Sequence, residues 1–116
     1  MKVIIAGSRN FTNYQKLEKE CDQFFQEQKN IEIVSGGHYK GADKLGEQYV
    51  KEKELKLKRF PAEWNIYGKA AGPKRNKEMA IYADALIVFW DGKSRGTKNM
   101  IQHAKQNGLI VKVVLF

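Results

Sequence analysis

Three short segments rich in small residues carry the side chains best suited to bind an anion. They are Gly7-Ser8-Arg9-Asn10, Ser35-Gly36-Gly37 with Gly41-Ala42-Asp43, and Asp91–Thr97. A phosphate needs backbone N–H groups that it can approach closely, and the positive end of a helix dipole stabilises it. We expect the pair Gly96-Thr97 to open a helix and to meet both needs. Ser8 and Arg9 could reach the same anion from the first segment.

None of these segments forms a known phosphate-binding motif. The dinucleotide fingerprint G-x-G-x-x-G and the P-loop pattern G-x-x-x-x-G-K-[ST] are both absent, so we expect neither a standard NAD(P) dehydrogenase nor a P-loop NTPase. For any one segment, the plainer alternative is that its glycines make tight turns and that Thr97 is a helix N-cap. Three such segments at one rim of a sheet favour an anion or nucleotide site.

Residues between these segments add candidates for ligand contacts. Arg75, beside Asn76, is expected near a helix start, where a cation is unfavourable unless an anion offsets it. Trp64 and Tyr67 could stack on a nucleobase, or they could form a hydrophobic plug beneath a loop. The full set of expected ligand-binding residues is Gly7, Ser8, Arg9, Ser35, Gly36, Gly37, Gly41, Asp43, Trp64, Arg75, Asn76, Asp91, Gly92, Ser94, Gly96 and Thr97.

The sequence offers no metal-binding pattern. Its single cysteine, Cys21, excludes an internal disulfide and a multi-cysteine zinc site, and neither His38 nor His103 has ligand spacing to it. Cys21 falls on the apolar stripe of an expected helix and is interpreted as an inert core residue. We therefore expect no metal and no obligatory cofactor.

The elements that must position these residues alternate between short apolar runs and segments with a helical period. Strands are expected at 3–6, 31–34, 55–60, 85–90 and 109–116, and helices at 13–25, from 41, from 73 and from 97 to Asn107-Gly108. The remaining segment, Pro61–Gly72, is expected to be a long connection, which is usually functional in a compact domain.

Strands that alternate with helices predict an α/β fold: a Rossmann-like, three-layer, doubly wound sheet of five parallel strands in the order 3-2-1-4-5. Ligands of such sheets bind at the carboxyl ends of the strands, where the strand order reverses. With this order, the reversal lies between the first and fourth strands. The segments after those strands, Gly7–Asn10 and Asp91–Thr97, would flank the site, with the segment after the second strand beside them.

Length and composition are consistent with a single domain over residues 1–116. The chain has 116 residues, of which 42% are hydrophobic and 29% are charged, which excludes a disordered chain. Its net charge of +8 indicates an anionic partner: nucleic acid, a membrane surface or a phosphorylated small molecule. No apolar run is long enough for a membrane span, so we expect a cytoplasmic protein without a membrane partner. Much of the lysine excess falls on expected solvated faces, which leaves Arg9, Arg75, Lys93 and Arg95 as the informative cations.

Taken together, the loops resemble the SLOG superfamily, and most closely its small YspA-like, YpsA-related branch. The matching pieces run through nearly the whole chain in order: Gly7-Ser8-Arg9, Ser35-Gly36-Gly37, Gly41-Ala42-Asp43, Pro61-Ala62-Glu63-Trp64, Gly68, Ala71-Gly72, Arg75-Asn76, Met79, Ala83-Asp84-Ala85, Trp90-Asp91-Gly92 and Gly96-Thr97. The resemblance implies a Rossmann-like domain that binds nucleotides or nucleotide-derived ligands such as ADP-ribose derivatives. It also makes a homo-dimer plausible.

The more distant resemblance to the Lonely Guy phosphoribohydrolases leaves catalysis open. Arg75 falls where those enzymes have an arginine, and Gly96-Thr97 falls within their P-G-G-x-G-T-x-x-E loop, but Met100 replaces the glutamate. Hydrolysis of an N-glycosidic bond needs a carboxylate, which methionine cannot supply. Asp43, Glu63 or Asp91 could substitute. Asp43 could instead cap a helix, Asp91 could be a turn residue, and Glu63 could simply be exposed.

Three functions follow, in order of preference. The first is a sensor or ligand-capturing module that binds a nucleotide or a nucleotide-derived ligand without chemistry. The second is a nucleotide phosphoribohydrolase or related N-glycosidase, with catalytic candidates Arg75, Glu63, Asp43 and Asp91. The third is a protein that binds single-stranded nucleic acid through its positive charge.

Overall fold

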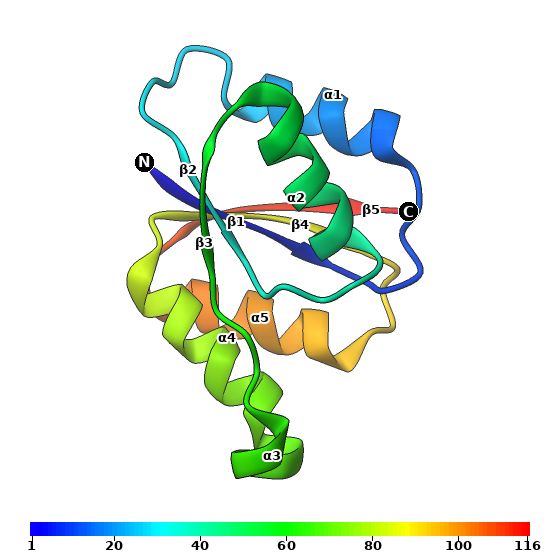
Figure 1. Cartoon of the computed structure of the whole chain (residues 1–116), viewed down its shortest axis with the longest axis vertical. Helices are drawn as coiled ribbons and strands as arrows, with labels where there is room; N and C mark the ends of the chain where they lie inside the picture. The colour runs from blue at the N-terminus through cyan, green and yellow to red at the C-terminus, as the bar shows by residue number, and fades with distance from the viewer.

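A computed structural model describes all 116 residues and contains a five-stranded, entirely parallel sheet. The strands are β1 (Lys2–Gly7), β2 (Glu32–Ser35), β3 (Lys56–Arg59), β4 (Ala85–Trp90) and β5 (Ile110–Leu115). Their spatial order is β3-β2-β1-β4-β5, which confirms the order expected from the sequence (Figure 1). The reversal of strand order therefore lies between β1 and β4, which pair from Val3 with Ala85 to Gly7 with Phe89.

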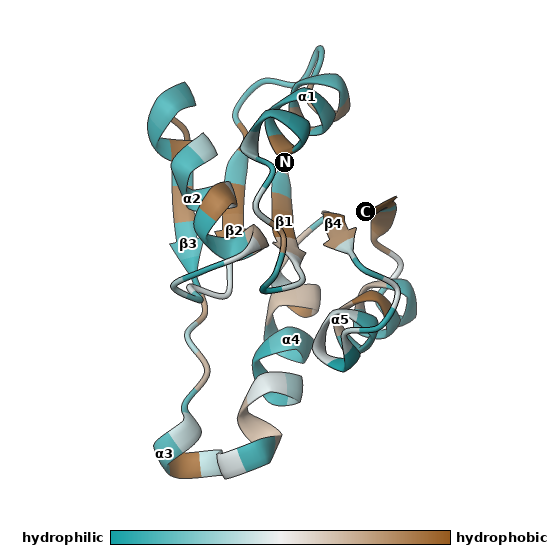
Figure 2. Ribbon diagram, turned by 90° about the vertical axis from the view of Figure 1, so that its right-hand side faces the viewer, coloured by the Kyte–Doolittle hydropathy of each residue, from teal (hydrophilic) through white to brown (hydrophobic).

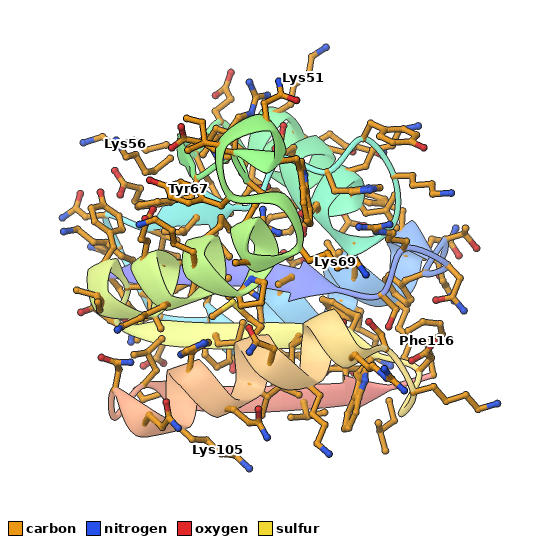
Figure 3. All side chains as sticks on the ribbon, turned by 90° about the horizontal axis from the view of Figure 1, so that it is seen from below. Lys51, Lys56, Tyr67, Lys69, Lys105 and Phe116 are labelled. Atoms are coloured by element: carbon orange, nitrogen blue, oxygen red, sulfur yellow. The ribbon has the colours of Figure 1, made fainter.

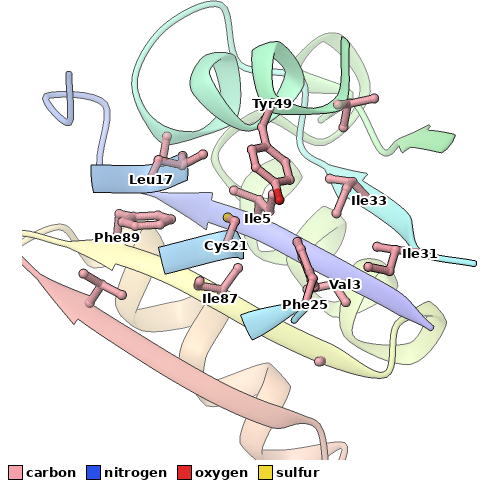
Figure 4. Close-up of a cluster of buried hydrophobic side chains, with 14 of the residues drawn as sticks. Val3, Ile5, Leu17, Cys21, Phe25, Ile31, Ile33, Tyr49, Ile87 and Phe89 are labelled. Atoms are coloured by element: carbon pink, nitrogen blue, oxygen red, sulfur yellow. The ribbon is translucent and has the colours of Figure 1, made fainter. Parts of the chain in front are cut away.

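Helices cover both faces of the sheet and create two separate cores. On one face lie α1 (Tyr14–Phe24) and α2 (Ala42–Lys53), and on the other lie α4 (Ala71–Tyr82) and α5 (Arg95–Gln106) (Figure 1). The α1–α2 face encloses the larger cluster, in which Leu17, Cys21 and Tyr49 pack against Ile5 and Ile87 (Figure 4). The second cluster joins α4 and α5 to the opposite side chains of β1 and β4. The fold is thus the expected three-layer α/β arrangement.

The pattern of side chains explains which strands are central. β4 is buried from Ala85 to Phe89 because helices cover it on both sides, and a continuous apolar run is typical of such a strand. β3 has the sequence Lys-Leu-Lys-Arg, with charged residues exposed, and it forms one edge of the sheet. Charged residues on an edge strand disfavour pairing with another chain.

The expectation that Pro61–Gly72 is a long connection is wrong in part, because this segment contains helical structure. Residues Trp64–Tyr67 form α3, a 3-10 turn follows at Gly68–Ala70, and α4 begins at Ala71. Pro73 does lie in the first turn of α4, where a missing N–H leaves no hydrogen bond unmade. The α3 segment projects away from the sheet, below the rest of the molecule in Figures 1 and 2, and it has no buried residue.

The last helix also begins earlier than expected. α5 starts at Arg95 rather than Thr97, and its N-cap is Ser94, whose Oγ accepts a hydrogen bond from the Thr97 N–H at 3.4 Å. Thr97 is therefore not the N-cap. At the start of α1 the N-cap is Asn13, whose side chain accepts a hydrogen bond from the Lys16 N–H at 3.0 Å. None of the helices combines the length and apolar character needed to cross a membrane.

Candidate functional site

A cavity of about 740 Å³ lies at the carboxyl ends of β1 and β4, where the strand order reverses. Its wall is built by the loop after β1, the segment that leads into α2, the first turns of α4, the loop after β4 and the start of α5. This volume falls within the range of small-molecule sites, roughly 300–1,000 Å³. The cavity therefore occupies the position that the strand order predicts for a ligand.

Positive charge predominates in the wall of the cavity. Four cationic side chains line it, Arg9, Lys40, Arg75 and Arg95, together with His38. Only two carboxylates, Asp43 and Asp91, lie among them. A cavity with this excess of cations favours an anionic ligand.

Arg75 extends from α4 towards the ends of β2 and β3. Its Nη1 donates to the backbone oxygens of Gly36 at 2.8 Å and Phe60 at 3.3 Å, and its Nε donates to Asn76 Oδ1 at 3.0 Å. Its Nη2 has no acceptor in the protein. Burial lowers the pKa of the guanidinium, which nevertheless stays protonated because its ordinary pKa is far above neutrality. Arg75 thus presents a fixed positive charge with two free N–H donors.

Gly36 makes room for this arginine. A Cβ atom at position 36 would lie 2.3 Å from Arg75 Nη1 and 2.9 Å from Asp43 Oδ2. Gly36 is itself buried and does not line the cavity. Its part is to let the guanidinium approach the backbone rather than to contact a ligand.

Asn76 links Arg75 to the start of α5. Its side chain is 6% exposed, and its Nδ2 donates to the Gly96 backbone oxygen at 3.3 Å and to Asn99 Oδ1 at 3.1 Å. Its Oδ1 accepts the bond from Arg75 Nε. Because Oδ1 and Nδ2 of Asn76 already have hydrogen-bond partners within the protein, Asn76 orients its neighbours more than it offers groups to a ligand.

Asp43 is a buried carboxylate in the wall of the cavity. It is 8% exposed, and its Oδ2 accepts a hydrogen bond from the His38 N–H at 3.1 Å. Burial raises the pKa of this carboxyl, while the His38 N–H and the positive charge of Arg75 oppose the rise. The alternative that Asp43 caps α2 is wrong, because its hydrogen bond goes back to His38 in the preceding loop.

Asp91 makes a turn after β4, as its plainer alternative expected. Its Oδ1 accepts hydrogen bonds from the N–H groups of Lys93 and Ser94, both at 2.8 Å. These bonds lower the pKa of the carboxyl, with smaller contributions from the Ser8 and Asn10 side chains. The turn fixes Ser94 as the N-cap of α5.

Two loops that line the cavity contain backbone N–H groups with no acceptor in the protein. Those of Arg95 and Gly96, in the first turn of α5, have no acceptor in the protein, and the same is true of Arg9 and Asn10 after β1. All four residues line the cavity. Free amides can donate to a phosphate group, and those of Arg95 and Gly96 also lie at the positive end of α5.

Not every residue expected at the site reaches the cavity. Those that line it are Gly7, Ser8, Arg9, Asp43, Trp64, Arg75, Asn76, Asp91, Ser94, Gly96 and Thr97. Those that do not are Ser35, Gly36, Gly37, Gly41, Gly92, Glu63 and the cation Lys93.

Three of the residues that do not line the cavity lie in other environments, and one of them, Glu63, is exposed as its plainer alternative expected. Ser35 Oγ donates to Glu47 Oε2 at 2.9 Å, and the same glutamate forms a salt bridge with Arg59. Gly41 has a φ of 76°, and a Cβ there would lie 2.5 Å from Arg9 Cα. Glu63 is exposed and lies in a shallow pocket beside α3.

The two aromatic candidates have separate environments. Trp64 is 52% exposed, lines the cavity and packs over Gly72, where a Cβ would lie 3.3 Å from its ring. Tyr67 does not line the cavity, and the ammonium group of Lys74 lies 4.9 Å from its ring centroid. Only Trp64 is therefore placed to stack on a ligand.

Several lining residues were not among the expected ligand-binding set: Asn10, His38, Lys40, Arg95 and Asn99. Asn10 and Arg95 were visible in the loops that flank the strand reversal. His38 and Lys40 had a weaker signal, as the polar residues of a loop that follows β2. Asn99 had none, because its contribution depends on how α5 is rotated about its axis.

Met100, at the position of the Lonely Guy glutamate, is part of both the hydrophobic core and the cavity wall. It is 2% exposed, belongs to the cluster between the sheet and α4–α5, and also lines the cavity. The structure brings no group of three or more His, Cys, Asp or Glu side chains together in a way that could hold a metal ion.

Comparisons with known proteins agree with this architecture. The model of the family described as YAcAr, the YspA, cpYpsA-related SLOG family, matches residues 1–67. The Gene 61 protein of Mycobacterium phage D29 is 27% identical over 117 residues, which cover 95% of this chain and 93% of that protein. No solved structure matches the chain at a significant level. The matched residues 1–67 include the loops after β1 and β2, which form one side of the cavity.

Proposed function

Because the chain belongs to the YspA, cpYpsA-related SLOG family, we propose that it binds an anionic ligand of the nucleotide class in the cavity between β1 and β4. The ligand is a nucleoside phosphate or a nucleotide derivative such as an ADP-ribose derivative. The protein acts as a sensor or a ligand-capturing module. Membership of this family fits a role that involves a nucleotide-related ligand.

One observation carries this proposal: the same cavity gathers an excess of cations and four unpaired backbone N–H groups. The phosphate would lie at the start of α5, against the amides of Arg95 and Gly96, with Arg9 opposite. Trp64, half exposed at another part of the wall, provides a flat surface on which a base could stack.

The first experiment looks for the ligand itself. Native mass spectrometry of the purified protein would detect a retained nucleotide. A thermal-shift panel of nucleoside mono-, di- and triphosphates, dinucleotides and cyclic nucleotides would follow, since a ligand that binds only the folded state raises the melting temperature. If no member of the panel shifts the melting temperature at millimolar concentration, the binding proposal fails.

The variant Arg75→Ala tests the site. We expect it to weaken binding of the ligand so identified roughly 10- to 100-fold, the range for loss of a charge-assisted hydrogen bond. The matched control is Arg59→Ala, which also removes an arginine with protein hydrogen bonds but lies outside the cavity. Isothermal titration of both variants makes the comparison, and equal weakening in the two would argue against this site.

A second candidate function, hydrolysis of an N-glycosidic bond, is favoured by one observation. Asp43 supplies a buried carboxylate inside the cavity, where Met100 cannot. Chromatography after incubation with nucleoside 5′-monophosphates would detect the free base, and Asp43→Asn should abolish its release. If no base is released while the nucleotide binds, the protein is a binding module only.

Single-stranded nucleic acid is the third and weakest candidate partner. The exposed lysines that carry much of the charge are not confined to one side of the molecule: in Figure 3, Lys51 and Lys56 lie at the top, whereas Lys105 lies at the bottom. A nucleic-acid groove requires cations along one continuous path.

A further inference from the structure

Two polar groups in the cavity wall have unused hydrogen-bonding capacity. Oδ2 of Asp43 is held by the His38 N–H, but Oδ1 has no partner, although 92% of this residue's surface is covered. Oδ1 keeps some accessible surface, since Tyr14 carries the only side-chain polar atom that is both fully buried and unpaired, and Asp43 lines the cavity. Nη2 of Arg75 likewise has no acceptor.

The side chains of Asp43 and Arg75 are neighbours, although they come from opposite layers of the fold. Asp43 belongs to the first turn of α2, and Arg75 belongs to α4, on the other face of the sheet. They meet above Gly36, where a single added Cβ would lie within 3 Å of both side chains. Burial raises the pKa of Asp43, and the positive charge of Arg75 opposes this rise, which reflects the same proximity.

A carboxylate that keeps one free oxygen, close to a guanidinium that keeps one free nitrogen, suits a ligand group that both donates and accepts. A phosphate is poorly suited to this, because near neutral pH it is mostly ionised and the carboxylate repels it. The cis-diol of a ribose can: one hydroxyl donates to Asp43 Oδ1, and its neighbour accepts from Arg75 Nη2. A carboxylate that receives a ribose hydroxyl is a general device of nucleotide-binding α/β sheets.

We propose that Asp43 and Arg75 bind the 2′,3′-diol of a ribose, so that the cavity selects ribonucleotides over deoxyribonucleotides. This inference rests on the proposed function, because it assigns the sugar of the same ligand. The phosphate then lies at the start of α5 and the base lies towards Trp64, which leaves the diol in the corner between α2 and α4.

The selectivity follows from what a deoxyribose would leave unpaired. Without one hydroxyl, either the buried carboxylate or the guanidinium loses its partner while it stays shielded from bulk water. A site built to hydrogen-bond a hydroxyl rejects the analogue that lacks it more strongly than a hydrophobic pocket discriminates by size. We expect the 2′-deoxy and 3′-deoxy analogues to bind roughly tenfold or more weakly than the ribonucleotide.

The experiment titrates the protein calorimetrically with the four ribonucleoside 5′-monophosphates, their 2′-deoxy counterparts and 3′-deoxyadenosine 5′-monophosphate. The same titrations on Asp43→Asn test the assignment. In that variant the amide oxygen is expected to accept the His38 N–H, so that an NH2 donor faces the cavity in place of an acceptor. The ribose-to-deoxyribose affinity ratio should then fall about fivefold or more.

Glu27→Gln is the matched control, because it removes one negative charge from an exposed residue outside the cavity. It should leave the affinity ratio unchanged. Ribo- and deoxyribonucleotides that bind the unaltered protein equally would overturn the diol assignment and leave the binding function intact. Failure of both classes to bind would overturn the two proposals together. Asp43→Asn removes an unfavourable buried charge, so we expect the variant to fold. The titrations of the unaltered protein with the deoxy analogues test the diol assignment even without this variant.

Discussion

At the scale of single residues, the site depends on how closely the side chain of Arg75 approaches the backbone. Gly36 is the residue that permits this, because any side chain there would occupy the position of the guanidinium. The bond to the Gly36 backbone oxygen and the bond to Phe60 hold the arginine against the ends of β2 and β3. A glycine outside the cavity thereby determines where a cation inside it lies.

We predict that Gly36→Ala weakens ligand binding about as much as Arg75→Ala, roughly tenfold or more. The added methyl group would displace the end of a flexible side chain, so the melting temperature should fall only modestly. The double variant is the control: if Gly36 acts through Arg75, adding Gly36→Ala to Arg75→Ala should change affinity little further. Additive losses would show that Gly36 acts by another route.

At the scale of elements, the start of α5 is organised by the turn that precedes it. Asp91 Oδ1 accepts hydrogen bonds from the N–H groups of Lys93 and Ser94. Ser94 in turn caps the helix, because its Oγ accepts a hydrogen bond from the Thr97 N–H. The Trp90 indole N–H donates to the Ser94 backbone oxygen at 3.1 Å, which ties the turn to β4. Together these bonds leave the amides of Arg95 and Gly96 free at the cavity.

The lowered pKa of Asp91 predicts a pH-dependent contribution to stability. Its pKa in the folded protein lies below the ordinary value of 3.8, so between these two values the unfolded chain binds more protons than the folded one. The contribution is fully present above pH 3.8 and is lost as the pH falls through the folded pKa.

Urea unfolding of the protein and of Asp91→Asn between pH 6 and pH 3 measures this effect. Asparagine keeps the acceptor oxygen but not the charge. We expect the unaltered protein to have the larger free energy of unfolding at pH 6, and the difference to shrink below pH 3.8. A difference that is constant or grows with acidity would contradict the role of the Asp91 charge.

At the scale of the whole molecule, two cores on opposite faces of one sheet share the central strands β1 and β4. Alternate residues of β1 serve the two sides: Val3 and Ile5 face α1 and α2, while Ile4 and Ala6 face α4 and α5. Cys21 is completely buried in the first core, and burial raises the pKa of its thiol to about 12. It is therefore a reporter of the opening of that core.

We predict that Cys21 in the folded protein reacts with thiol reagents at pH 8 slower by orders of magnitude than in unfolding concentrations of urea, because the reactive thiolate is both rare and inaccessible. Leu17→Ala, which creates a cavity beside it and costs roughly 2–5 kcal/mol, should accelerate the labelling. Labelling of the unaltered protein as fast as that of a free thiol would show that this core is not closed.

The strand order, the reversal point and the loops around it could all be inferred from residue patterns. The reason is that the run Ala85–Trp90, the helical stripe from Tyr14 and the alternation of strands with helices are local or nearly local features. The right-handed connection between parallel strands then leaves few topologies to consider. The loops that follow β1 and β4 were placed correctly for the same reason.

Which residues of those loops line the cavity, and which only support others, was decided by the tertiary structure. Nothing in the sequence distinguishes Gly36, which makes room for Arg75, from Gly96, which lines the cavity. Nor could residue patterns show that Asp43 and Arg75, 32 positions apart and on opposite layers, meet with one free polar group each. Hydrophobic periodicity specifies which face of an element is buried. The contacts of a polar side chain depend on the rotation of two helices and on the path of the loop between them, which only packing decides.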